Sequence, residues 1–316
     1  MPYVDTKVIL ENADKHGYGV PALNINNLEF LHYIIEAGVK KNSPVIIETS
    51  QGAMKYAGNG DFRKGAEIFV KMVKAFADEV DIPVALHLDH GKSFEHIVAA
   101  IKAGYSSVMI DASEHPFEEN MKITKEIVKI AHAAGVSVEA ELGQLAGIED
   151  EAVAAENVLV DPDEAKKFVE ETGVDFLAPA VGTSHGAFKF KGAAKIDYDR
   201  IKKVKEYTKI PLVLHGASSV VPEFVEIAEK HGADFGGAKG VPSEILQEAV
   251  KCGINKVNTD TDLRIAFVAG LREFLNANPK EFDPRKYFKL AREYTIKVIT
   301  DRMDVLGSTG KAELFK

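Results

Sequence analysis

The sequence predicts a TIM (β/α)8 barrel, an α/β fold in which eight parallel strands alternate with helices, formed as one domain over residues 1–316. Short runs rich in β-branched residues alternate with segments of helical periodicity almost to the end of the chain. Eight such runs can be counted, as a closed parallel barrel requires. The Gly-x-Gly-x-x-Gly turn that usually opens a doubly wound sheet does not occur.

The predicted strands are short, and several begin directly after a proline, as at Pro83 and Pro211. Proline suits the first residue of a strand because its missing N–H is not yet needed in the ladder. The intervening helices carry apolar residues at helical spacing, as in Ile123, Ile127 and Ile130. The strands are expected at 19–25, 44–49, 83–88, 106–110, 137–142, 176–179, 211–214 and 254–258.

Two segments depart from this alternation. Residues 143–161 form a long connection after the fifth strand with no clear period, which predicts a mobile loop over the active site. Residues 279–316 exceed what a minimal barrel needs and predict a C-terminal helical extension. We expect this extension to make oligomer contacts or to cover one end of the barrel.

The composition is that of a globular protein with a large core, since 46% of the residues are hydrophobic and 28% are charged. A net charge of −9 argues against a general nucleic-acid or membrane-surface binder. The single Cys252 cannot form an intrachain disulfide, and no apolar run approaches the roughly 20 residues of a membrane span. The first residues lack the features of a signal peptide. We therefore expect a cytoplasmic protein with neither nucleic acid nor membrane as partner.

Nearly every predicted strand ends on a polar residue. In a barrel of this kind the chemistry lies at the carboxyl ends of the strands, so these residues are expected to meet on one rim. Burying so many polar groups without a use would be costly, because each needs a partner. The residues concerned are Asn24, Ser50, Asp89, His90, Asp111, Glu139, Glu141, His185, His215, Asn258 and Asp260.

Three histidines at these strand ends, His90, His185 and His215, predict a zinc site. Three neutral imidazoles leave zinc an open fourth position, which distinguishes a catalytic site from a closed structural one. His87 has the opposite parity to His90 in its strand, so we assign it to the barrel core or to the layer behind the ligands.

Two glycine-bearing runs, at 182–186 and 215–219, are candidate phosphate-binding loops. Small residues let backbone N–H groups and hydroxyls approach an anion, and the loops after the last barrel strands are the usual phosphate site. Either run alone is equally compatible with a tight turn before a helix. Their place beside two candidate zinc ligands favours phosphate binding, with Lys189 able to supply a countercharge.

Five ordered motifs resemble those of the class II, metal-dependent fructose-bisphosphate aldolases, and the resemblance covers essentially the whole chain. The motifs are Leu-His-Leu-Asp-His-Gly at 86–91, Val-Glu-Ala-Glu-Leu-Gly at 138–143, Gly-Thr-Ser-His-Gly at 182–186, Leu-His-Gly-Ala-Ser at 214–218 and Val-Asn-Thr-Asp-Thr-Asp at 257–262. The resemblance implies reversible aldol cleavage of fructose 1,6-bisphosphate to dihydroxyacetone phosphate and glyceraldehyde 3-phosphate, as in glycolysis.

The resemblance also implies a role for each matched residue. Zinc would be bound by His90, His185 and His215, with Glu141 as an alternative ligand. Asp89 would exchange a proton with the C4 hydroxyl, and Glu149 would remove the C3 proton of dihydroxyacetone phosphate. The substrate-binding residues would be Asn24, Ser50, Gly186, Lys189, Gly216, Ser218, Asn258, Asp260, Thr261 and Arg285.

Within that set, Gly186, Lys189, Gly216, Ser218 and Thr261 would hold the phosphate of dihydroxyacetone phosphate, and Asn258 would contact its enediolate region. Ser50 and Arg285 would hold the other phosphate, with Arg285 reaching in from a neighbouring subunit. The family commonly also uses a monovalent cation, Na⁺ or K⁺. We therefore expect a homodimer or a homotetramer.

One departure from the pattern concerns the base. Some relatives carry two consecutive glutamates in the loop after the fifth strand, whereas this chain has Ile148 followed by Glu149. The assignment of the base therefore depends on a single residue.

Three other functions are compatible with part of this pattern. Tagatose-bisphosphate aldolases of the same family typically have a small apolar residue where this chain has Asp260, which favours the fructose substrate. A zinc-dependent hydrolase barrel usually has a His-x-His pair at its first strand, where this chain has Asn24-Ile25-Asn26. A non-catalytic sugar-phosphate-binding protein would not need both Asp89 and Glu149.

Overall fold

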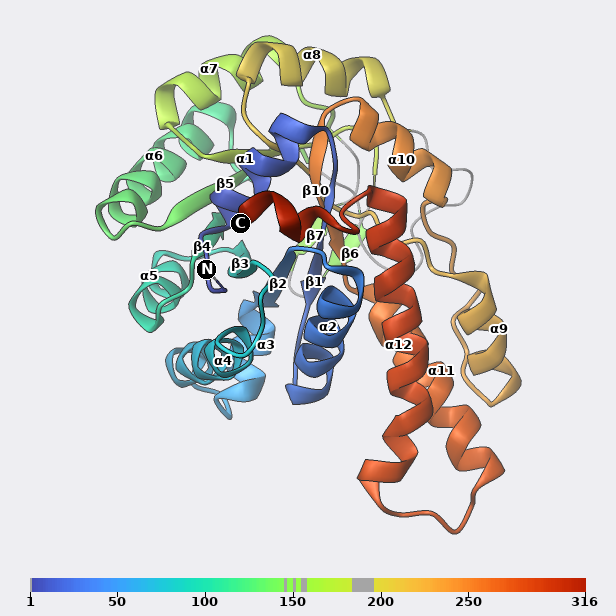
Figure 1. Ribbon diagram of the computed structural model, residues 1–316. Coiled ribbons are helices and arrows are strands. Elements are labelled where there is room, and N and C mark those ends of the chain that lie inside the picture. Colours follow the sequence, from blue (N-terminus) through green and yellow to red (C-terminus); the bar gives the residue numbers. More distant parts are fainter. Residues whose placement is uncertain (1, 145–146, 150–151, 155–157, 184–195) are drawn as a thin grey trace.

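The computed structural model describes residues 2–144, 147–149, 152–154, 158–183 and 196–316. Eight parallel strands close into a barrel in the order β1-β10-β9-β8-β5-β4-β3-β2, and helices surround it (Figure 1). The predicted fold class is confirmed. The barrel strands are β1 (Val20–Asn24), β2 (Val45–Ser50), β3 (Val84–Gly91), β4 (Ser107–Ile110), β5 (Ser137–Leu142), β8 (Phe176–Pro179), β9 (Leu212–Leu214) and β10 (Ile254–Thr259).

Two strands are longer than the sequence pattern indicates. β3 continues past Leu88 to Gly91, and β10 continues past Asn258 to Thr259. Both extensions carry polar residues, which the hydrophobic pattern assigns to loops. The barrel pairing of the neighbouring strands is what keeps these residues in the sheet.

The helices begin and end at local signals. Asp5, Asn27 and Ser93 each accept a backbone N–H at a helix start, and Gly17 and Gly104 end helices in the left-handed conformation that glycine adopts without strain. The helices are α1 (Thr6–His16), α2 (Leu28–Lys41), α3 (Gln51–Ala57), α4 (Phe62–Ala77), α5 (Phe94–Ala103), α6 (Phe117–Ala133), α7 (Pro162–Thr172), α8 (Tyr198–Thr208), α9 (Pro222–Lys230), α10 (Ser243–Lys251), α11 (Thr261–Ala277), α12 (Pro284–Leu306) and the 3₁₀ helix η1 (Lys311–Phe315).

The barrel strands are buried on both faces. Outward-facing side chains such as Leu86 and Leu88 pack against the surrounding helices. Inward-facing side chains at the amino end of the barrel, among them Ala85 and Phe176, pack against Ile9 of α1. Helix α1 thus lies across the amino end, which leaves the carboxyl ends of the strands for the site (Figure 1).

The connection after β5 contains regular structure that the sequence pattern did not reveal. Strands β6 (Gly147–Glu149) and β7 (Ala152–Ala154) pair as an antiparallel hairpin within the segment expected to be a loop without a period. Three residues per strand are too few for an alternating pattern to be visible in a sequence.

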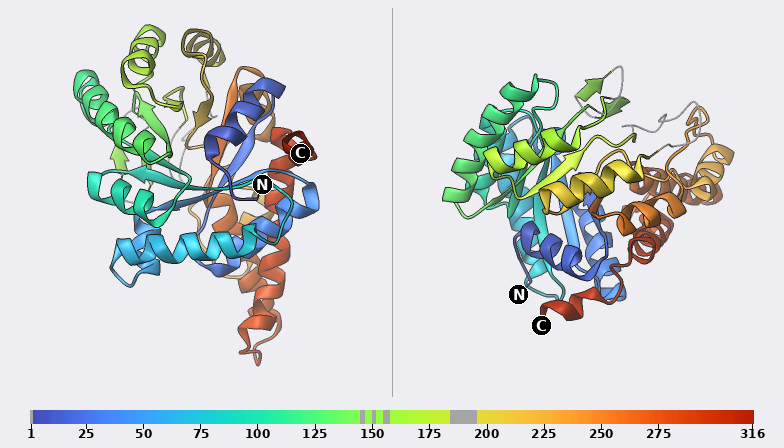
Figure 2. Two further views of the ribbon diagram at one scale, coloured as in Figure 1. Left: turned by 60° about the vertical axis from the view of Figure 1, so that its left-hand side comes forward. Right: turned by 90° about the horizontal axis from the view of Figure 1, so that it is seen from above.

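The predicted C-terminal helical extension is confirmed. Helices α11 and α12 pack side by side, and the far end of this helical hairpin projects beyond the barrel (Figures 1 and 2). After α12, the amide N–H of Gly310 donates to the carbonyl of Lys41 at 2.8 Å, and η1 lies near α1 with both termini close together (Figure 2). Among the described helices, none combines the length and the apolar composition that crossing a membrane requires.

Candidate active site and metal centre

Asp89 occupies the centre of the polar group at the carboxyl ends of the strands. Its Oδ2 accepts a hydrogen bond from Asn24 Nδ2 at 3.0 Å, and its Oδ1 accepts one from Asn258 Nδ2 at 3.1 Å. All three residues are buried. The structure therefore brings together three predicted site residues from β1, β3 and β10, with both carboxylate oxygens oriented by amides.

His90 reaches this site through an unusual backbone conformation. His87 and Asp89 face the barrel interior, so strict alternation would direct His90 towards the helices. The φ of His90 is 46°, and the β3–β4 register shifts between Leu88 and Gly91. The expectation that parity separates His87 from His90 is wrong, because this irregularity also turns His90 inwards. A non-glycine residue in this region is strained, and such strain is often found at functional sites.

The imidazoles of His90 and His215 face each other. His90 Nε2 and His215 Nδ1 lie 2.9 Å apart, and the two rings are nearly perpendicular at 86°. The remaining nitrogens contact carboxylates: His90 Nδ1 lies 2.9 Å from Asp111 Oδ2, and His215 Nε2 lies 2.7 Å from Glu139 Oε1. Metal-ligating histidines are typically held in this way, with the outer N–H bonded to a carboxylate and the inner nitrogen directed at the ion.

The electrostatics of these groups suit a metal. Burial lowers the pKa of His215, which favours the neutral imidazole that a metal requires. Burial alone would raise the pKa of Asp111, but its bond and attraction to His90 and the nearby Lys92 outweigh burial and hold the pKa well below its usual range. Asp89, His90 and His215 offer ligand atoms within 4.8 Å of one another. The residues present therefore fit a divalent ion such as zinc.

Glu141 belongs to a second group of potential ligand atoms, with His90 and Asp111. Its Oε2 lies 4.0 Å from His90 Nδ1 and has no hydrogen-bond partner among the residues that the structure describes. Burial, followed by repulsion from Asp111, raises the pKa of Glu141 well above its usual value. A cation nearby would satisfy this oxygen, which supports the prediction that Glu141 is an alternative ligand.

A buried charged cluster lies in the barrel interior beneath the site. Lys256 Nζ lies 2.8 Å from Glu139 Oε2, 2.6 Å from Glu48 Oε1 and 2.9 Å from Asn258 Oδ1. Burial alone would raise the pKa of Glu139, but attraction to Lys256 and the contacts with His215 and His87 together outweigh burial and hold the pKa well below the usual range. Burial raises the pKa of Glu48 well above its usual value despite the same lysine. Lys256 therefore fixes the amide orientation of Asn258 and contacts the carboxylate that holds His215.

The sequence did not assign Asp111, Glu139, Lys256 or Glu48 to these roles. A signal was present for three of them. Glu48, Glu139 and Lys256 each lie two residues before a predicted site residue in the same strand, and residues two apart share a face. His87, placed in the core or behind the ligands, contacts Glu139 Oε2 at 3.3 Å, as that assignment expected.

The second candidate phosphate loop follows β9. Gly216 has a φ of 60°, a left-handed conformation, and Ser218 is buried. Thr261 is the first residue of α11, and the next residue, Asp262, accepts the amide N–H of Ser219 at 2.8 Å. The loop and the start of α11 are therefore adjacent, as binding of one phosphate by Gly216, Ser218 and Thr261 would require.

Several predicted site residues lie outside the described part of the chain or are only partly described. His185, Gly186 and Lys189 fall within residues 184–195, outside the described residues. Glu149 lies in β6, and only its backbone is described. These assignments remain predictions.

Three other predicted residues have local partners. Ser50 pairs in register with Asp89 and caps α3, since its Oγ accepts the Ala53 N–H at 3.1 Å. Asp260 Oδ2 lies 2.7 Å from Arg264 Nη2. The side chain of Arg285 is 88% exposed at the start of α12 and pairs with Asp283 at the end of the helical hairpin.

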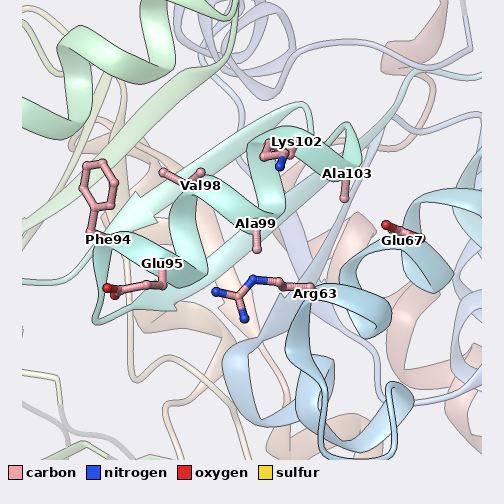
Figure 3. A pocket seen from close by; sticks show the side chains of 8 residues that line it. All are labelled: Arg63, Glu67, Phe94, Glu95, Val98, Ala99, Lys102 and Ala103. Atoms are coloured by element: carbon pink, nitrogen blue, oxygen red, sulfur yellow. The ribbon is translucent and has the colours of Figure 1, made fainter.

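The pocket shown in Figure 3 is not part of this site. It has a volume of about 370 Å³ and lies on the outside of the barrel between α4 and α5, where Arg63 and Phe94 line it. The closed barrel and the polar groups at the carboxyl ends of its strands define the class of protein: a (β/α)8-barrel enzyme with a site suited to a divalent metal.

Comparison with known proteins identifies the family. The family model described as "Fructose-bisphosphate aldolase class-II" matches residues 4–311. The chain is 54% identical over 306 residues to a fructose-bisphosphate aldolase of Helicobacter pylori (strain ATCC 700392 / 26695), covering 96% of this chain and 97% of that protein. It is 49% identical over 306 residues to a fructose-bisphosphate aldolase of Thermus caldophilus, covering 96% and 98%.

Solved structures agree with this assignment. The YdjI aldolase from Escherichia coli K12 superimposes with a TM-score of 0.78 at 30% identity, covering 98% of this chain and 99% of that one. A fructose-bisphosphate aldolase from Campylobacter jejuni gives a TM-score of 0.79 at 25% identity, covering 98% and 97%. The chain belongs to the class II fructose-bisphosphate aldolase family, whose members are metal-dependent aldehyde-lyases. The hydrolase and the non-catalytic alternatives are thereby excluded.

Proposed function

We propose that this chain is a zinc-dependent fructose-1,6-bisphosphate aldolase, which reversibly cleaves that sugar to dihydroxyacetone phosphate and glyceraldehyde 3-phosphate. One observation carries the proposal. The Asp89 carboxylate lies between two amide donors and beside two facing histidines, each of which contacts a further carboxylate. In this arrangement a proton acceptor, Asp89, lies next to a candidate metal site formed by the two histidines.

Asp89 is the group that moves a proton in this proposal. Its two oxygens each accept an amide hydrogen bond from Asn24 or Asn258, so the carboxylate is held in one orientation. In cleavage it accepts the proton of the C4 hydroxyl while the C3–C4 bond breaks, and in condensation it returns that proton. Zinc, when bound by His90, His185 and His215, supplies a Lewis acid that stabilises the negative charge left on the dihydroxyacetone phosphate fragment.

Glu149, at the end of β6, is assigned the proton transfer at C3. It removes the C3 proton of dihydroxyacetone phosphate in condensation and returns a proton to C3 after cleavage. A base on a hairpin above the barrel can approach C3 after the sugar has bound and can shield the carbanion-like fragment from water. Asn258, whose amide is fixed by Lys256, is placed to contact the same fragment. Glu141 would serve as an alternative ligand for the ion.

The remaining predicted residues bind the two phosphates. Gly216, Ser218 and Thr261 lie together after β9 and at the start of α11, which supports one phosphate site there with Gly186 and Lys189. Ser50 lies beside Asp89 for the other phosphate. Arg285 is exposed at the start of α12, in the helical hairpin whose far end projects beyond the barrel (Figure 1). This position supports its action in the site of a second copy in a homodimer or homotetramer.

A monovalent cation, Na⁺ or K⁺, would bind beside the phosphate. In the cell, the enzyme would act in the cytoplasm, in glycolysis and gluconeogenesis. These assignments rest on the family to which the chain belongs.

An aldol-cleavage assay tests the proposal. Fructose 1,6-bisphosphate is supplied to the enzyme before and after treatment with a chelator, and zinc is then restored. We expect chelator to abolish cleavage and zinc to recover it. Cleavage that persists in chelator, or that is absent after zinc is restored, would refute the proposal.

The choice between fructose and tagatose substrates depends on Asp260. The two bisphosphates differ in configuration at C4, and we expect faster cleavage of the fructose form. Faster cleavage of tagatose 1,6-bisphosphate would overturn this preference.

A further inference from the structure

The segment Gly216–Val220, which follows the metal ligand His215, is held by a carboxylate from α11. Asp262 Oδ2 accepts the N–H of Ser219 at 2.8 Å, and its Oδ1 accepts the N–H of Val220 at 2.5 Å. Val220 has a φ of 50°, which is strained for a β-branched residue. The two hydrogen bonds to Asp262 keep the chain in this conformation.

The opposite side of the segment packs against backbone. A Cβ atom placed on Gly240 would lie 2.3 Å from the carbonyl oxygen of Ser218, so the chain at Gly240 can approach only because it has no side chain. The N–H of Val241 donates to that same carbonyl at 3.0 Å. The segment is therefore fixed from both sides.

Arg302 completes the arrangement from α12, forty residues after Asp262. Its Nη2 donates to Asp262 Oδ2 at 2.6 Å and to Ser219 Oγ at 3.0 Å. The side chain of Arg302 is 4% exposed and that of Asp262 is fully buried. Arg302 Nη1 is buried and has no hydrogen-bond partner among the residues that the structure describes. A buried ion pair with an unsatisfied donor is costly to keep, so stability alone is a weak explanation for it.

The hydrogen bonds to Asp262 divide the segment into two parts. The amides of Ser219 and Val220 are occupied, whereas those of Gly216, Ala217 and Ser218 donate no hydrogen bond to any described residue. Only the first part can therefore offer N–H groups to an anion. The carboxylate of Asp262 would repel that anion unless its charge were cancelled, and the buried guanidinium of Arg302 cancels it.

We propose that Arg302 is a positioning residue for phosphate binding: through Asp262 it fixes the segment Gly216–Ser218 with its amides free, and it neutralises the carboxylate behind them. The inference deepens the proposed function and rests on a phosphorylated substrate binding at this segment. Arg302 does not touch the substrate.

Binding of inorganic phosphate and of dihydroxyacetone phosphate, followed by ³¹P NMR on the full-length, metal-free protein, tests this directly. The variants are Arg302→Met, Asp262→Asn, the double variant and Arg302→Lys. Arg292→Met is the matched control, because Arg292 lies on the same helix and pairs with Glu36 at the surface, away from the loop. Circular dichroism and thermal unfolding establish that each variant is folded.

We expect Arg302→Met to weaken binding of both ligands by about tenfold, the scale of one uncompensated nearby charge. The KM for the sugar bisphosphate rises by a similar factor, with a smaller change in kcat. The double variant recovers most of the lost affinity, since no charge is left unpaired, and Arg302→Lys retains most of it. Arg292→Met binds as the wild type does.

Four results would overturn the inference. A folded Arg302→Met protein with wild-type phosphate affinity shows that Arg302 does not position the loop. Equal losses in Arg302→Met and the double variant contradict the charge argument. If Arg302→Met does not fold, a double variant that binds phosphate more weakly than Asp262→Asn contradicts the inference, because Arg302 would then act other than through Asp262. If the wild-type protein binds neither inorganic phosphate nor dihydroxyacetone phosphate, the proposed phosphate site does not exist. Because the binding measurement needs no zinc and no turnover, a failed cleavage assay leaves its outcome interpretable.

Discussion

His90 combines a strained backbone with two side-chain contacts that fix its ring. Its left-handed φ turns the imidazole into the barrel, and Asp111 holds Nδ1 so that Nε2 faces His215. Left-handed geometry at a non-glycine residue persists only when surrounding contacts enforce it. At the scale of single residues, a metal site here would therefore depend on the carboxylates behind the histidines as well as on the histidines.

Replacing Asp111 with Asn should weaken zinc binding by about 10–100-fold, because the His90 ring loses the carboxylate that orients it. Zinc affinity can be measured by competition with a chromogenic chelator. The matched control is Glu114→Gln, which changes an exposed carboxylate 3.9 Å from the same Lys92. Unchanged affinity in Asp111→Asn would show that Asp111 does not support the metal.

Loss of Lys256 should strongly destabilise the barrel, because its ammonium group is buried between two carboxylates. Replacing it with Met leaves Glu139 charged and without its ammonium partner, which should lower the free energy of unfolding by about 3–5 kcal/mol. Denaturant unfolding measures the change. Adding Glu139→Gln to this variant should recover part of the loss, and a double variant less stable than Lys256→Met alone would contradict the electrostatic explanation.

At the scale of elements, the helical hairpin of α11 and α12 carries residues with two different proposed roles, one at each end of α12. One end of α12 contributes Arg302 behind the candidate phosphate loop, and the other end carries Arg285 on the projecting tip. Phe282 at this tip is 88% exposed, close in sequence to the exposed Arg285. The tip is the part of the hairpin that a second copy of the chain would contact if the proposed role of Arg285 is correct.

Replacing Arg285 with Ala should raise the KM for fructose 1,6-bisphosphate by about tenfold with little change in kcat, since one charged phosphate contact is lost. If Arg285 acts across an interface, mixing this variant with Asp89→Ala should restore activity at low substrate concentration. Mixed subunits would then contain one site with both residues intact. No recovery after subunit exchange would count against the intersubunit role.

At the scale of the whole molecule, the barrel separates a stable end from a reactive end. Helix α1 and apolar interior side chains fill the amino end, the buried charged cluster around Lys256 occupies the middle, and the polar site lies at the carboxyl ends of the strands. Because zinc would join ligands from β3 and from the segments after β8 and β9, its binding should stabilise the folded barrel as a whole.

Zinc should therefore raise the free energy of unfolding by about 2.7 kcal/mol when its free concentration is 100 times its Kd. Thermal unfolding with and without zinc measures this as an increase in Tm. The His215→Ala variant, which loses a ligand, should show a much smaller increase and little aldolase activity. A wild-type Tm that does not respond to zinc would contradict the metal site.

The sequence by itself determined the barrel, its eight strands and the residues at the strand ends. Hydrophobic alternation, helical spacing, proline and glycine are local signals, and they place Asp89, His90, His215 and Asn258 at the rim without any knowledge of contacts. The exceptions are local as well. The hairpin of β6 and β7 is too short to show a period, and the irregularity at His90 breaks the parity on which side-chain direction depends.

Only the tertiary structure decided which polar groups meet. Asp89 bonds Asn258 across 169 residues, His90 faces His215 across 125, and Arg302 reaches Asp262 across 40. Closure and register of the barrel set these contacts, and no local pattern encodes them. Asp111, Glu139, Lys256 and Arg302 acquire their roles in this way, because a buried charge is defined by its partner and the partner lies in another strand or helix.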